Sequence, residues 1–146
     1  MSKLHLDLST ELYHTPLNLK VLLNDDVLLS TVASENEYNL TADLDNKTEY
    51  CLRIVIDGKT NQHSKVEQNK MVSSAQIILE KLMIDTIDIK HIIQQSDKCM
   101  SYKHNTNNNT DEIVEEFYND VFGYNGTVEI KFYMPIKDWF LETIRS

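Results

Sequence analysis

The chain has 146 residues, of which 41% are hydrophobic, and it carries a net charge of −9 from 14 Lys and Arg against 23 Asp and Glu. This length and apolar content suit one domain with one core, so we expect a single domain over residues 1–146. An acidic chain without a basic cluster lacks the charges that neutralise phosphates, which disfavours nucleic acids and anionic membrane surfaces as partners.

The first residues alternate polar and apolar side chains, which predicts a half-buried strand with Leu4, Leu6 and Leu8 on one face. The alternation leaves no continuous apolar run for a secretory signal peptide, so we expect no export signal. No later stretch reaches the roughly 18 apolar residues of a membrane-spanning helix. Proteins that are not exported usually keep their thiols reduced. Without an export signal, Cys51 and Cys99 are therefore predicted to be free.

A hairpin is predicted next, with arms at residues 17–23 and 27–32. The turn between them is Asn-Asp-Asp, and Asn and Asp tolerate the left-handed backbone that tight turns need. Further strands are expected at 39–44 and 50–56. Residues 59–73 are polar and lack periodicity, which predicts a long loop.

The apolar stretch from 75 to 93 permits two interpretations. Its β-branched residues favour strands, whereas Ile77, Ile78, Lys81 and Leu82 also satisfy helical spacing, so strand and helix both remain open for 75–83. The apolar phase shifts at Asp85-Thr86, which predicts a bulge or tight bend that joins two strands.

The last third of the chain is predicted to begin with an exposed polar loop over residues 94–111. A short helix is then expected at 111–120, followed by a strand at 127–133. A closing helix at 135–145 carries an apolar stripe of Ile136, Trp139, Phe140 and Ile144. We expect this helix to pack on its own domain; docking on a neighbouring subunit is the alternative.

Together these elements predict a mainly β fold. About eight strands with one or two short helices, the last at the C-terminus, are typical of an antiparallel β-sandwich or jelly roll.

The sequence contains no recognised catalytic or cofactor motif. It has no nucleophile elbow, no His-x-x-x-His pair and no Gly-rich phosphate loop. We therefore expect no enzyme activity, no cofactor and no metal site. All five histidines are predicted to lie at the surface, and Asp43, Asp45, Asp85 and Asp88 to form turns.

Aromatic residues near loops and chain ends are the remaining candidates for contacts, because flat rings pack well on partners and stack on sugars. Tyr102, Tyr118, Tyr124 and Trp139 fall in this group. Tyr124 is predicted to be the most exposed ring, and Trp139 to pack in the core. Tyr124, Trp139 and Phe140 are the predicted interface or ligand contacts.

Two sets of segments in the sequence resemble known groups of proteins. Residues 75–89, AQIILEKLMIDTIDI, resemble a strand pair of small β-sandwiches similar to carbohydrate-binding modules, in which an apolar strand leads into an Ile-Asp-x-Ile step. The hairpin at 17–25, the Ile-Asp step and the ending GYNGTVEIKFYMPIKDW at 123–139 resemble, in that order, small uncharacterised proteins of tailed bacteriophages.

The bacteriophage resemblance implies a non-catalytic structural or accessory protein of the virion, as a head decoration or a tail component. Such a protein acts through contacts with other virion proteins or with copies of itself, and is assembled into the particle in the host cytoplasm. The other resemblance implies the alternative, a carbohydrate-binding module that recognises host-surface or other glycans.

Overall fold

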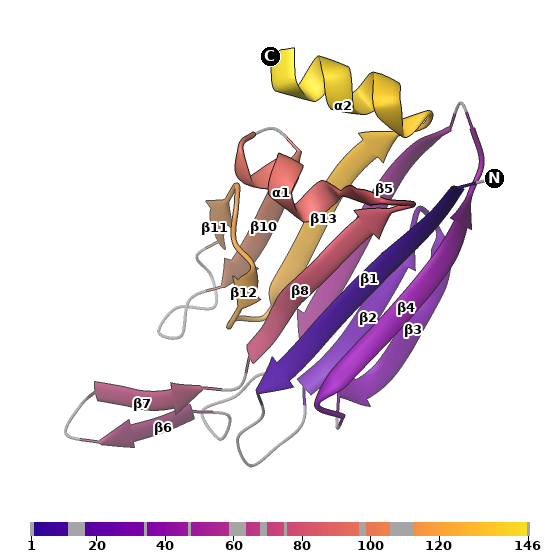
Figure 1. Ribbon diagram of the computed structural model, residues 1–146. Coiled ribbons are helices and arrows are strands. Elements are labelled where there is room, and N and C mark those ends of the chain that lie inside the picture. The colour runs from indigo at the N-terminus through magenta and orange to yellow at the C-terminus, as the bar shows by residue number, and fades with distance from the viewer. Residues whose placement is uncertain are drawn as a thin grey trace.

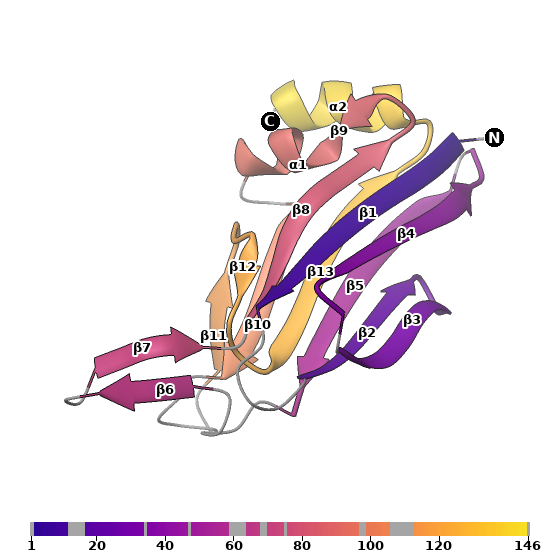
Figure 2. The ribbon, with the colours of Figure 1, turned by 60° about the horizontal axis from the view of Figure 1, so that its bottom comes forward.

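The computed structural model describes residues 2–11, 17–33, 35–46, 48–58, 64–67, 70–74, 76–96, 99–105 and 113–145. Two antiparallel sheets pack face to face, and two helices lie at one end of them (Figures 1 and 2). The predicted antiparallel β-sandwich, with its last helix at the C-terminus, is confirmed. Neither helix in the described ranges has the length and apolar character that a membrane span requires.

The described strands of the two sheets number eleven, against about eight expected. The first sheet consists, in spatial order, of β12 (Val121–Phe122), β8 (Gln76–Ile84), β1 (Ser2–Glu11) and β4 (Glu37–Leu44), with β9 (Ile87–Asp88) paired to β8. The second sheet consists of β11 (Ile113–Glu116), β10 (Met100–Asn105), β13 (Gly126–Tyr133), β5 (Glu49–Asp57), β2 (Leu17–Leu23) and β3 (Asp26–Ala33).

The core lies between the two sheets and is built by the alternation seen in the sequence. Leu4, Leu6 and Leu8 of β1 are fully buried, and Ile54 of β5 lies opposite Val128 of β13 on the inner face of the second sheet. Each fully buried Leu or Ile stabilises the fold by roughly 1.5–3 kcal/mol relative to an exposed one. The intervening residues of β1, β5 and β13 are half-buried or exposed on the outer faces of the sheets.

The predicted N-terminal hairpin is present as β2 and β3. Asn24 in its turn has a φ of 54°, the left-handed conformation that Asn tolerates. The turn is also bound to β5, because the backbone N–H of Cys51 donates to Asn24 Oδ1 at 2.8 Å.

The open question at 75–83 is resolved in favour of a strand for the described residues 76–83, which lie in β8 and pair with β1. The predicted bend is confirmed at Asp85, where φ is 54°. The strand expected after it is only the two-residue β9. Asp88 then caps a helix, α1 (Ile89–Gln94), that buries Ile89, Ile92 and Ile93 at helical spacing.

Two predicted loops contain strands. Within 59–73, β6 (Ser64–Glu67) pairs with β7 (Lys70–Ser74) in a separate hairpin, and the rest of that segment lies outside the described residues. Residues 97–98 and 106–111 of the second loop also lie outside them. Within 94–111, β10 occupies the second sheet between β11 and β13. Its inward residues are Met100, Tyr102 and His104. Because two of them carry polar atoms, the sequence lacks the apolar alternation that predicts a strand.

The helix predicted at 111–120 is wrong over its described part. Residues 113–116 form the edge strand β11, in which Val114 lies opposite His104, and the chain then bends into β12. The expected apolar helical face does not exist, because Ile113 and Phe117 are 62% and 51% exposed. Pairing with β10 overrides the local helical spacing.

The strand and helix predicted at the C-terminus are confirmed as β13 and α2 (Ile136–Arg145). Helix α2 packs on β13 and contacts α1. Ile136 and Trp139 are buried and Phe140 is half-buried, whereas Ile144 is 52% exposed. The helix therefore packs on its own domain, as expected, with a narrower stripe than predicted.

Candidate functional site

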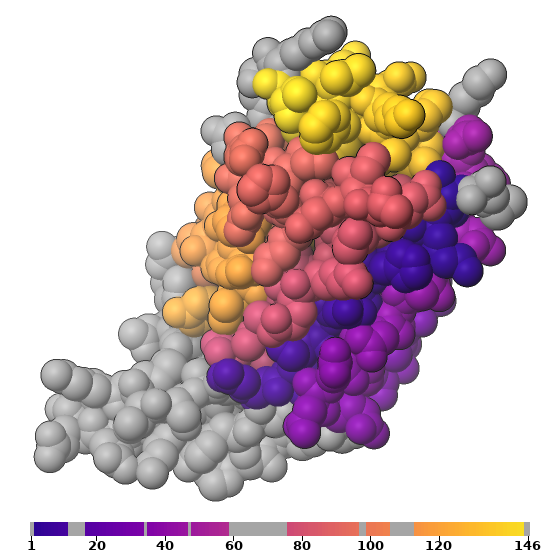
Figure 3. Space-filling model, in the orientation of Figure 1, coloured from indigo at the N-terminus to yellow at the C-terminus, as the bar shows by residue number. Residues whose placement is uncertain are grey.

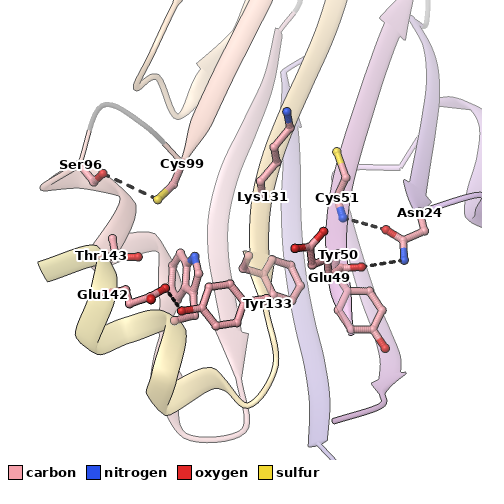
Figure 4. Close-up of a pocket in the computed structure, with 12 residues that line it drawn as sticks. Asn24, Glu49, Tyr50, Cys51, Ser96, Cys99, Lys131, Tyr133, Glu142 and Thr143 are labelled. Atoms are coloured by element: carbon pink, nitrogen blue, oxygen red, sulfur yellow. Dashed lines mark hydrogen bonds between the residues drawn. The ribbon is translucent and has the colours of Figure 1, made fainter. Parts of the chain in front are cut away.

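A groove of about 700 Å³ lies between α2 and the neighbouring ends of β5 and β13 (Figure 4). It gathers side chains from five separate parts of the sequence. They are Asn24, Glu49, Tyr50, Cys51, Ser96, Cys99, Lys131, Phe132, Tyr133, Trp139, Glu142 and Thr143.

An aromatic cluster underlies the groove. The rings of Tyr50 and Phe132 stack with centroids 5.5 Å apart, and Trp139 meets Phe132 edge-on at 6.4 Å. The hydroxyl of Tyr50 accepts a hydrogen bond from the backbone N–H of Asp45 at 2.7 Å. The Trp139–Phe132 contact packs α2 on the sandwich, and the other two join β5 to β13 and to the turn before it.

The polar side chains of the groove come from both of its sides. On the helix side, the Tyr133 hydroxyl donates to Glu142 Oε2. On the sheet side, Asn24 Nδ2 donates to the carbonyl of Glu49 at 3.3 Å, and Lys131 projects from β13 (Figure 4). Half-buried rings beside amides and carboxylates can stack on, and hydrogen-bond to, a polar ligand.

The two cysteines lie on either side of β13. Cys51 is opposite Lys131 on β5, and the N–H of Lys131 donates to the carbonyl of Cys99 on the other side. Two strand spacings of about 4.8 Å separate them, which exceeds the reach of a disulfide. Both are free thiols, as predicted.

The Cys51 thiol is a weak nucleophile. Its burial raises its pKa, and the neighbouring Glu129 carboxylate acts in the same direction, against the opposing effect of Arg53. A thiol with a raised pKa stays protonated at neutral pH, and only the thiolate attacks electrophiles. Among the described residues, no group of three His, Cys, Asp or Glu side chains is placed to hold a metal ion.

The structure does not bring the three predicted contact residues together. Trp139 lines the groove, and Phe140 packs against the core from the same helix. Tyr124 precedes β13, so it lies at the far end of that eight-residue strand, about 25 Å away. It is only half-buried rather than freely exposed, because its ring stacks on His104 at 4.7 Å.

His104 contradicts the prediction that all histidines lie at the surface, since it is only 4% exposed. Its Nδ1 lies 2.7 Å from the carbonyl of Asn105, and its Nε2 lies 2.9 Å from Glu116 Oε2. Beside it, the buried Tyr102 hydroxyl donates to the carbonyl of Tyr124, and burial raises the pKa of Tyr102. This cluster binds β11 to β10.

A second candidate surface, not expected from the sequence, is the open edge of the sandwich at β3 and β4. Each strand is the last of its sheet, and the two are consecutive in the chain and in contact. In Figure 3, β4 lies along the margin of the visible face, beside β1. No strand in the described parts of the chain pairs with the outer side of either one.

The regularity of β4 distinguishes it from most exposed edges. Its eight residues pair with β1 without a register shift, whereas β3 has one opposite Val21 and Leu22. It contains no Pro and no Lys. Its burial alternates strictly, with Glu37, Asn39, Thr41 and Asp43 exposed on the outer face of the sheet.

Comparison with known proteins yields no relative of this chain: no protein-family model, no curated protein and no solved structure matches it.

Proposed function

We propose that this protein is a non-catalytic structural or accessory component that acts through protein–protein contacts. The observation that carries the proposal is the regular, open eight-residue edge of β4. An unpaired edge strand offers a row of N–H and C=O groups to which another chain can add a strand.

Proteins without such a partner usually protect their edges. Short strands, prolines, lysines and bulges prevent edge-to-edge pairing. In β4 none of these four is present, and at eight residues it exceeds the mean strand length of about 5–6. Its charged residues, Glu37 and Asp43, oppose pairing with a second copy but leave the row of backbone groups open to a chain of different charge. An edge that is long, regular and closed to its own copy but open to another chain suits strand addition by a partner, so we assign the edge to assembly.

The assembly that we propose is a tailed-bacteriophage particle, as a head decoration or tail component. The support for this is the resemblance of the hairpin and the C-terminal segment to small phage proteins. The partners are then other virion proteins, and neither nucleic acid nor a membrane is needed. The net charge of −9 agrees with this choice, because it repels phosphates.

The test is the composition of purified particles. Particles of a phage that encodes the chain are banded in a density gradient, and the chain is quantified against the major capsid protein by mass spectrometry. The proposal predicts a fixed molar ratio in every preparation. Its absence from the banded particles would refute the virion role.

A second candidate function is glycan binding in the groove beneath α2. The observation in its favour is that the half-buried Tyr133 ring lines the same groove as the polar side chains of Glu142, Asn24 and Lys131, since sugars are bound by rings and polar groups together. A glycan array with the purified protein tests it. Specific binding that is lost in Tyr133→Ala and kept in Tyr118→Ala, a change outside the groove, would support this function over the first.

A further inference from the structure

We infer that the partner of β4 is an extended segment of another protein in which two basic residues, six positions apart, flank alternating apolar residues. This inference rests on the proposed function and specifies the chemistry of the partner. Three features of β4 lead to it: the direction of its backbone groups, the exposure of its inward side chains and the position of its charges.

The backbone groups of β4 that face outward can be assigned. The N–H of Thr10 donates to the carbonyl of Asn36 at 2.9 Å, and these two residues continue the register in which Ser9 lies opposite Glu37. Because bonded and non-bonded pairs alternate in an antiparallel ladder, Tyr38, Leu40 and Ala42 bond to β1. The groups of the residues between them therefore face the open edge.

The other neighbour of β1 agrees with this assignment. Both backbone groups of Lys3 are directed to the β8 side, since its N–H donates to Asp85 Oδ1 and its carbonyl accepts from Asp85 N–H, each at 2.9 Å. Odd-numbered residues of β1 thus face β8, and even-numbered ones face β4. The outward N–H and C=O groups of β4 belong to Glu37, Asn39, Thr41 and Asp43.

The inward side chains of β4 are incompletely covered. Tyr38, Leu40 and Ala42 pack against the core but stay partly exposed, whereas the equivalent positions of the central strand β1, Leu4, Leu6 and Leu8, are fully buried. A strand added at this edge extends the inner face of the sheet. Apolar side chains at alternate positions of that strand would cover these three residues.

The charges of β4 disfavour a second copy as its partner. Facing residues of an antiparallel pair point to the same side, and like charges directly opposite each other are destabilising. In the two symmetric registers that overlap most of β4, carboxylates oppose each other: centred on Leu40, Glu37 meets Asp43, and centred on Thr41, Glu37 meets Asp45.

The same charges specify the partner. Glu37 and Asp43 are six residues apart on the exposed face of β4. We therefore expect a partner segment of seven residues with Lys or Arg at its first and last positions, opposite these two carboxylates. Apolar residues at its second, fourth and sixth positions would cover the inward side chains of β4. This pattern reads the same in parallel and antiparallel orientation.

A pair of labelled peptides tests the inference. The probe is acetyl-Lys-Val-Thr-Val-Thr-Val-Lys-amide, and its match carries Glu in place of both Lys. Fluorescence anisotropy with the full chain at low salt should show binding of the Lys peptide at least tenfold tighter than of the Glu peptide. Equal affinities, or no binding of the Lys peptide at millimolar concentration, would overturn the inference.

Thr41 allows the edge to be blocked without loss of an internal hydrogen bond. Thr41→Pro removes one outward N–H, and Thr41→Val keeps it while changing the side chain similarly. The Pro variant should lose at least tenfold in affinity for the Lys peptide, and the Val variant less than threefold. Undiminished binding by a folded Pro variant places the peptide elsewhere and overturns the inference.

Charge reversal keeps the inference testable if the proline variant does not fold. The double variant Glu37→Lys, Asp43→Lys should prefer the Glu peptide, and an unchanged preference for Lys would contradict the assignment. If particles contain the chain in fixed ratio but the two peptides bind equally, the proposed function stands and the basic partner is excluded. If particles lack the chain, the proposed function fails whatever the peptides show.

Discussion

Trp139 is the residue through which α2 is attached to the sandwich. It is 4% exposed and meets Phe132 edge-on, so Trp139→Ala removes a large buried ring and leaves a cavity. We expect a loss of about 3–5 kcal/mol in the free energy of unfolding, measured by urea denaturation. The control is Ile144→Ala on the exposed side of the same helix, which should change it by less than about 0.5 kcal/mol. Equal effects of the two changes would show that the helix is not held by this ring.

Asp85 links the β8–β9 turn to β1 through a charge. The hydrogen bond from the backbone N–H of Lys3 lowers the pKa of the Asp85 carboxyl below its usual 3.8. Because the folded pKa is the lower one, the contribution to stability is complete above 3.8 and is lost as the pH falls through the folded value.

The variant Asp85→Asn tests this linkage, since Asn tolerates the φ of 54° but does not titrate. Unfolding free energies measured from pH 5 to pH 2 should fall less steeply for the variant than for the native chain. Parallel profiles would contradict the role assigned to this carboxylate.

At the scale of elements, the short helix α1 depends on its cap. The Asp88 carboxylate accepts from the N–H of His91 at 3.1 Å, and a helix of six residues has few other bonds to hold its first turn. Asp88→Ala should cost about 0.5–2 kcal/mol in thermal or urea unfolding. Asp88→Asn preserves the hydrogen-bond acceptor, so its free energy of unfolding should stay within about 0.5 kcal/mol of that of the native chain. A loss as large as that of the Ala variant would argue against capping.

Elements with a strong local pattern were predictable from the sequence. The β2–β3 hairpin, β5, β13 and α2 each show clear periodicity and begin or end at recognisable turn or helix-start residues. Strand β10 was missed because its buried positions include Tyr102 and His104, whose polar atoms are satisfied only by Tyr124, Asn105 and Glu116 in the fold. Pairing with β10 in turn converts 113–116 from the predicted helix into a strand.

The groove and the β4 edge could not be predicted from the sequence, for different reasons. The groove combines residues from Asn24 to Thr143, which only the sheet topology brings together. Of its aromatic residues, only Trp139 had been singled out. The edge of β4 was predicted as a strand, but its position at the end of the sheet follows from strand order, which no local pattern encodes.

At the scale of the whole molecule, the charges on β4 should control self-association. The native chain is expected to be a monomer of 17.0 kDa, since pairing of two β4 strands in their longest registers would place carboxylates opposite each other. Glu37→Lys places Lys opposite Asp43 twice in the register centred on Leu40, so the variant should form a weak dimer at low salt. Sedimentation equilibrium with and without 0.5 M NaCl measures this; a native dimer that salt does not affect would contradict the account.

Amide hydrogen exchange of the free chain, followed residue by residue by NMR, tests the central claim that β4 presents an open edge. The account predicts an alternating pattern within one strand. The amides of Tyr38, Leu40 and Ala42, which bond to β1, should be protected, and those of Glu37, Asn39, Thr41 and Asp43 should exchange rapidly. Uniform protection of all seven amides in the monomer would mean that the edge is already covered, and would contradict both the proposed mode of assembly and the partner inferred from it.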